Sequence, residues 1–159
     1  MLLNAYSMSN YNEQYSRKTN FKVFGVQERE GEKTEELVCK VIEEAAGVKI
    51  QMSDIVACHR IPGQAGQKRP ILVKMRNTEC KATVMRKRSK VKKGNSGVKL
   101  VDDVTKLNAQ LISQLNEHAA IESAWYFNGS VFGQYKGKRI KFDIIDDIDA
   151  KIRKSKDRR

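Results

Sequence analysis

The sequence has no long hydrophobic run, and it contains few cysteine, proline and aromatic residues. No stretch approaches the roughly 20 apolar residues that a membrane-spanning helix needs, and the N-terminal segment is too polar for a signal peptide. The three cysteines include no CxxC pair, so their spacing predicts neither a zinc site nor a redox motif. We therefore expect no membrane partner and a cytoplasmic or nuclear location.

Acidic residues are scarce relative to basic ones. The chain of 159 residues has 31 Lys and Arg against 19 Asp and Glu, which gives a net charge of +12. Most of the excess lies between Lys68 and Lys99, where Glu79 is the one acid. A solvated helix face explains many charge runs, but these like charges repel one another unless something negative lies nearby. The segment therefore favours a nucleic-acid partner.

The hydrophobic pattern predicts an α+β protein. Strands are expected at residues 21–26, 55–61, 70–76 and 98–101, with helices at 34–46 and 78–90. This β-α-β-β-α-β order over residues 21–101 is the split arrangement of ferredoxin-like folds, which include RNA-recognition motifs (RRMs). Residues 102–150 are expected to form a small α+β C-terminal domain with a helix at 104–120, a β-hairpin, a third strand and a last helix. Residues 1–20 are expected to be a flexible lead-in and residues 151–159 a basic tail.

Five segments resemble one family in their order and spacing. They are EQYSRKTNFKVFGVQEREGE, ACHRIP, RPILVKM, VKLVDDVTKLN and AWYFNGSVF. Together they resemble the nucleic-acid-binding region of the first-open-reading-frame proteins of LINE-type (non-LTR) retrotransposons, over residues 13–150. The resemblance implies an RRM-like domain followed by a small C-terminal domain, with single-stranded nucleic acid held between them. It also implies ribonucleoprotein formation, nucleic acid chaperone activity and no active site.

Two features depart from that family. A long coiled coil precedes this region in the family, whereas here the roughly 20 residues before the first strand lack sustained heptads. We therefore expect a homo-oligomer only if a longer form carries a coiled coil. In addition, Lys22 stands where the first strand of an RRM usually has a base-stacking aromatic, and Leu72, Lys74 and Arg76 lie on the outer face of the third strand. Base stacking on this sheet is expected to be weak.

Cationic side chains are the principal candidates for binding. The main binding edge is expected at Arg86, Lys87, Arg88, Lys90, Lys92 and Lys93. The other cationic candidates are Lys22, Arg60, Lys68, Arg69, Lys74, Arg76, Lys136, Lys138 and Arg139. The position of Arg60 at the end of a strand suits a phosphate contact and a structural ion pair equally. The imidazole of its neighbour His59 is expected to be partly buried, because no ligand partners stand near it in the sequence.

The Asn128-Gly129 dipeptide predicts a type I′ turn between two strands. Its register pairs Trp125 with Phe132 on one face and leaves Tyr126 and Tyr135 on the other. One face must pack on the neighbouring helix, and we expect Trp125 and Phe132 to do so. Tyr126 and Tyr135 are then candidates to stack on an unpaired base.

Acidic clusters at Asp102-Asp103 and Asp146-Asp147-Asp149 raise the question of metal-dependent phosphodiester chemistry. Both precede expected helices, where capping and the helix dipole account for them. The chain has no Gly-rich phosphate loop and no HExxH motif. We therefore predict no catalytic residue, metal or cofactor, and a non-catalytic protein that binds single-stranded RNA or DNA. The alternatives are a protein-interaction module retained from a decayed element and a nuclease.

Overall fold

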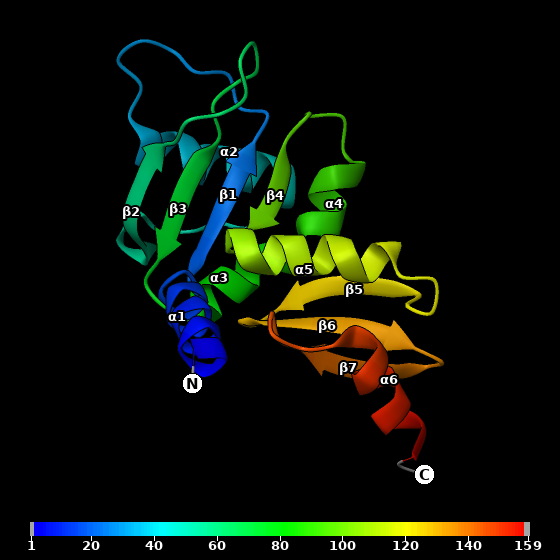
Figure 1. The fold of residues 1–159 in the computed structure, drawn as a ribbon. Helices are drawn as coiled ribbons and strands as arrows, with labels where there is room; N and C mark the ends of the chain where they lie inside the picture. The colour runs from blue at the N-terminus through cyan, green and yellow to red at the C-terminus, as the bar shows by residue number, and fades with distance from the viewer. Residues whose placement is uncertain (1, 158–159) are drawn as a thin grey trace. The chain divides into compact units, whose positions relative to one another are not determined.

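The computed structural model describes residues 2–157, and it divides the chain into two compact units (Figure 1). The central unit is Thr19–Asp103. The terminal unit combines the residues before Thr19 with those from Val104 onward. Each has its own hydrophobic core and its own antiparallel sheet, so the predicted α+β class is confirmed. No helix among residues 2–157 is both long and apolar enough to cross a bilayer.

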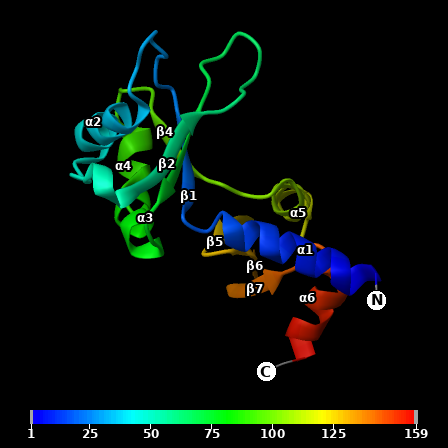
Figure 2. The same ribbon diagram turned by 90° about the vertical axis from the view of Figure 1, so that its left-hand side faces the viewer.

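The central unit contains a four-stranded sheet. Its elements are β1 (Asn20–Phe24), α2 (Thr34–Ala46), a 3₁₀ turn (Met52–Asp54), β2 (Ile55–Arg60), β3 (Ile71–Met75), α3 (Thr78–Met85), α4 (Arg88–Lys93) and β4 (Lys99–Asp102). The strand order is β2-β3-β1-β4, and every pair is antiparallel. Helices α2, α3 and α4 lie on one side of this sheet (Figure 2), and no helix of the same unit covers its other face.

Side-chain alternation decides which face of this sheet is buried. Phe21 and Val23 of β1 pack beneath Val38 and Ile42 of α2, and all four are almost fully buried. The chain then turns at Gly25, which has φ +83°, and a Cβ there would collide with the carbonyl oxygen of the nearby Gly97. Glycine is therefore required at the end of β1.

The expected helix at 78–90 is two helices, because α3 ends at Met85 and α4 begins at Arg88. The expectation that Asp102 and Asp103 cap a helix was also wrong. Asp102 forms ion pairs with Lys81 at 2.8 Å and Arg88 at 3.1 Å. Asp103 accepts a hydrogen bond from Asn20 and lies 3.7 Å from the Lys22 ammonium. The carboxylates of Asp102 and Asp103 are therefore paired with cations and an amide of the same unit rather than with a helix N-terminus.

The terminal unit contains a three-stranded sheet. Its elements are α1 (Leu2–Ser16), α5 (Lys106–Glu117), β5 (Ser123–Phe127), β6 (Ser130–Tyr135), β7 (Lys138–Phe142) and α6 (Ile148–Asp157). The strand order is β5-β6-β7. Leu111 and Leu115 of α5 and Ile152 of α6 pack together with Val131 and Phe142 of the sheet. Thr105 caps α5, since its hydroxyl accepts from the Asn108 backbone N–H at 3.1 Å.

The N-terminal segment differs from the expected flexible lead-in, because residues 2–16 form a helix. Its buried residues are polar: Gln14 accepts hydrogen bonds from Thr105 N and Asn108 Nδ2 at 2.9 and 3.0 Å, and Asn10 accepts from the Thr105 hydroxyl. An apolar stripe is the usual signal of a packed helix, and α1 has none on this side. Most of the expected basic tail is likewise helical, as the last part of α6.

Candidate nucleic-acid interface

Six exposed cations lie in the turn between α3 and α4 and on α4 itself. We call this set the α3–α4 cluster, and it consists of Arg86, Lys87, Arg88, Lys90, Lys92 and Lys93. Val84 and Val91 fix the two helices to the core, so the polar positions between and around them face solvent. Within residues 2–157, Arg88 is the one member in an ion pair, with Asp102.

The α3–α4 cluster has the properties of a phosphate-binding surface. No acid stands in the sequence between Glu79 and Asp102. Lysine ammonium groups attract phosphates as point charges, and arginine can donate two parallel hydrogen bonds to one phosphate. Three of the lysines also lie in the last turn of α4, where the helix dipole favours cations.

The uncovered face of the four-stranded sheet carries fewer available cations than expected. Lys22 and Lys74 are half-buried; Lys22 pairs with the buried Asp103, and the Lys74 ammonium lies 3.4 Å from the Thr19 hydroxyl. Phe24, which was not predicted as a site residue, shares this face with Lys22 and is 37% exposed. Strand alternation alone identifies it, since residues two apart share a face.

Two residues of β2 lie in unexpected surroundings. His59 is exposed rather than partly buried, and it pairs with Leu72 of β3 across the sheet. The Arg60 side chain is only 6% exposed. Its guanidinium makes two hydrogen bonds to the Glu32 carboxylate, at 2.8 and 3.2 Å, and donates to the carbonyl oxygens of Val26 and Arg69. Of the two roles open to Arg60, the geometry supports the structural ion pair.

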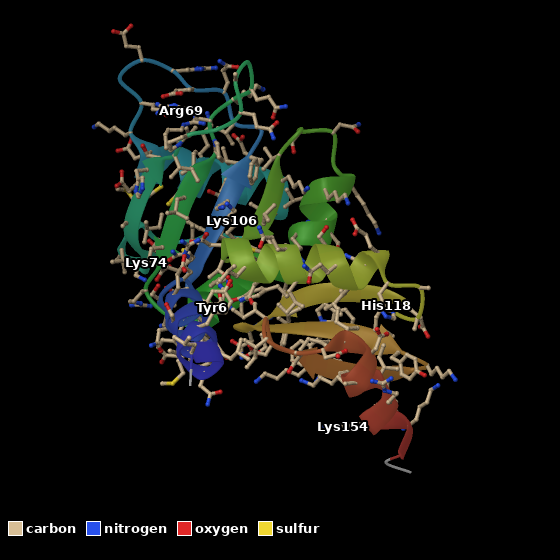
Figure 3. The ribbon with its side chains drawn as sticks, viewed as in Figure 1. Tyr6, Arg69, Lys74, Lys106, His118 and Lys154 are labelled. Carbon is tan, nitrogen blue, oxygen red and sulfur yellow. The ribbon has the colours of Figure 1, made fainter. Side chains whose placement is uncertain are left out.

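The remaining cations of the central unit lie near its loops. Figure 3 places Arg69 among the loops at one end of the sheet, where its guanidinium makes two hydrogen bonds to Glu28. That hydrogen bonding lowers the pKa of the Glu28 carboxyl and raises the pKa of Arg69. Arg76 lies 3.2 Å from Asp54, and Lys68 is exposed in the β2–β3 loop. All three cations remain at the surface, two of them beside acids.

The expected faces of the hairpin were wrong. Tyr126 and Tyr135 are buried, at 6% and 4% exposure, whereas Phe127 on the opposite face is 59% exposed. The inner face also presents the small residues Ala124 and Gly133, and a Cβ at Gly133 would lie only 3.0 Å from the Phe142 ring of β7, so packing on this face is close.

The outer face of the three-stranded sheet brings aromatic rings and cations together. The rings of Trp125 and Phe132 lie 6.2 Å apart between centroids and 25° from parallel. The Arg139 guanidinium lies 4.8 Å from the Phe132 centroid, and Lys141 is the cross-strand partner of Phe132.

The other two candidate cations of this unit lie elsewhere. Lys136 occupies the β6–β7 turn with φ 44°, and its ammonium lies 5.7 Å from the Tyr135 ring. Lys138 shares the inner face with Tyr135 and donates to the Ser155 carbonyl oxygen at 3.5 Å. Of the three predicted cations here, the fold brings only Arg139 to the aromatic rings of the outer face.

Residues 2–157 contain no group of three or more His, Cys, Asp or Glu placed to hold a metal ion. Burial raises the pKa of the Cys58 thiol to about 12 and also raises that of Cys39, so both thiols are protonated at neutral pH. No protein-family model matches this chain, and no curated protein matches it.

Proposed function

We propose that this protein binds single-stranded nucleic acid, RNA foremost, through contacts between the α3–α4 cluster and phosphates, and that it carries out no catalysis. The observation that carries the proposal is the cluster itself, whose six cations are exposed and largely without acidic partners in the described chain. Cations packed this closely gain most from a ligand with closely spaced negative charges. Nucleic acid has that charge density.

The topology of the central unit supports an RRM-like fold. The order β-α-β-β-α-β, with α3 and α4 together in the second helical position, and the sheet order β2-β3-β1-β4 fit the ferredoxin-like arrangement. Together with the sequence resemblance, they support descent from a LINE-type retrotransposon protein. Such a protein coats RNA in a ribonucleoprotein. It also acts as a nucleic acid chaperone, because cations lower the repulsion between annealing strands.

Removing three charges from the cluster tests the proposal. The variant Arg86→Gln, Lys87→Gln, Lys90→Gln leaves the Arg88–Asp102 ion pair in place. The matched control, Lys106→Gln, Lys154→Gln, Lys156→Gln, also lowers the net charge from +12 to +9, at exposed positions of the terminal unit. Figure 3 shows Lys106 and Lys154. Affinity for single-stranded RNA, single-stranded DNA and duplex is measured by titration.

We expect the cluster variant to bind single-stranded RNA more than about tenfold more weakly, and the control to change affinity by less than about threefold. Equal losses in the two variants would show that only net charge matters. A wild-type protein that binds none of the three ligands contradicts the proposal and favours a protein-interaction module.

A further inference from the structure

The outer face of the three-stranded sheet has an unusual composition. When helices cover one face of an antiparallel sheet, the other face normally alternates to polar residues. Here that face carries Trp125, Phe127 and Phe132, while α5 and α6 pack on the opposite side. Phe127 is exposed and the other two rings are half-buried. A cluster of aromatic rings that reach solvent in this way marks a surface with a ligand.

The arrangement of these side chains is ordered across the three strands. Trp125 of β5 stacks on Phe132 of β6, and the Arg139 guanidinium of β7 lies over Phe132. Phe127 continues the row along β5, two residues from Trp125, and has the most exposed ring of the three. We call Trp125, Phe127, Phe132, Arg139 and Lys141 the aromatic platform.

The charge of the aromatic platform indicates its ligand. None of the positions that these three strands present on the outer face is acidic, and both Arg139 and Lys141 are exposed. Aromatic rings and guanidinium planes both stack on unpaired bases, and neighbouring cations pair with the phosphates between them. A partner that was only apolar would leave Arg139 and Lys141 without counter-charges.

We propose that the aromatic platform is a second binding subsite, which stacks unpaired bases of the single strand. This inference rests on the proposed function and adds to it a surface that stacks on bases, distinct from the phosphate contacts of the α3–α4 cluster. Stacking of this kind accepts any base, because each base has a flat π face. The platform therefore favours single strands over duplexes, whose bases are already stacked.

Trp125 is the one tryptophan of the chain, so its fluorescence reports directly on the aromatic platform. The full-length chain is titrated with oligo(U) of about 12 nucleotides, within the usual site sizes of single-strand binders. Inorganic polyphosphate of matched charge provides phosphates without bases. We expect oligo(U) to quench Trp125 emission at saturation and polyphosphate to leave it nearly unchanged.

Variants at Phe127 test stacking without disturbing the core, because this side chain is 59% exposed. We expect Phe127→Ala to weaken oligo(U) binding by about five- to 150-fold, the range for one lost stacking contact. Phe127→Tyr keeps a ring and retains binding, whereas Phe127→Leu keeps apolar area but loses binding. The matched control is Tyr11→Ala, at a ring 57% exposed on α1, which leaves affinity unchanged.

The outcomes separate this inference from the proposed function. If oligo(U) binds through the α3–α4 cluster while Trp125 emission is unchanged and Phe127→Ala is neutral, the platform is wrong and the proposed function stands. Equal quenching by polyphosphate also overturns the platform. Full binding by Phe127→Leu overturns it as well, because that result indicates a merely apolar contact. Trp125 emission that changes only with protein concentration overturns it too, because that result indicates binding of a second copy of the chain. If no oligonucleotide binds at all, both proposals fail.

Discussion

The two units have the same kind of packing but carry different side chains on their exposed surfaces. Each has an antiparallel sheet with helices packed on one face. The central unit concentrates exposed cations in the α3–α4 turn and on α4, and the sheet face away from its helices mixes Lys22 and Lys74 with Leu72. The terminal unit instead places aromatic rings and Arg139 on its outer sheet face. One surface suits phosphates and the other suits bases.

The comparison also shows that a count of cations is not a count of binding residues. Arg60 and Arg69 of the central unit are both bonded to glutamates, and Arg60 is nearly buried. Arg139 of the terminal unit contacts a ring instead. Among residues 2–157 its guanidinium has no hydrogen-bond partner, so its donors are open to a ligand while one face rests on Phe132.

The largest expected effect is on stability, and it distinguishes Arg60 from Arg139. Arg60→Ala removes a nearly buried guanidinium from the Glu32 carboxylate and from the carbonyl oxygens of Val26 and Arg69, and we expect a loss of about 3–5 kcal/mol in the free energy of unfolding. Arg139→Ala removes an exposed cation–π contact and costs about 0.5–1 kcal/mol. Urea denaturation followed by circular dichroism measures both. A loss of stability in Arg60→Ala as small as that in Arg139→Ala would mean that Arg60 is not structural.

A smaller loss of stability is expected from a substitution in α1, the helix that was not predicted from the sequence. Gln14 is 1% exposed and accepts hydrogen bonds from Thr105 N and Asn108 Nδ2. Gln14→Ala leaves buried donors without this acceptor, so we expect a loss of about 1–3 kcal/mol. The matched control is Asn12→Ala, at an exposed position of the same helix, which changes stability little. If Gln14→Ala is as neutral as the control, α1 does not depend on these contacts.

The smallest effect concerns pH. The hydrogen bonds from Arg60 hold the pKa of the Glu32 carboxyl below its ordinary value of 4.5. A carboxyl whose pKa is lowered on folding stabilises the folded state at every pH above its pKa in the unfolded chain. That contribution is lost as the pH falls through its pKa in the folded protein. We expect the melting temperature of the wild type to fall more between pH 6 and pH 3 than that of Glu32→Gln. Parallel curves would exclude Glu32 as a source of acid sensitivity.

Much of the central unit follows from local pattern. The apolar spacing of residues 34–46 predicted α2 with its observed ends, because Gly47 stops the helix in a left-handed conformation. The exposure of the α3–α4 cluster also follows from charge, since adjacent cations are rarely buried. The burial and ion pairing of Arg60 do not follow from local pattern, because its partner Glu32 is 28 residues away in the sequence.

The terminal unit was harder to predict because its signals conflict. The hairpin register was predicted correctly, but the prediction that the face of Trp125 and Phe132 packs on the helices was wrong. In β7, Ile140 and Phe142 alternate with Arg139 and Lys141, and the two-residue turn pairs Lys141 with Phe132. That alternation in the sequence already indicates which face is outer. Helix α1 gave no comparable signal, because its buried side is polar.

The most direct test of the account is the salt dependence of single-strand binding in the two variants. We expect the logarithm of the wild-type binding constant for oligo(U) to fall with log salt at a slope of about −4 if six phosphates are neutralised. The triple Gln variant of the α3–α4 cluster should have a slope smaller in magnitude by about 2. Phe127→Ala should give a line parallel to the wild type at lower affinity. A slope that changes with Phe127→Ala but not with the cluster variant would contradict the assignment of phosphates to one surface and bases to the other.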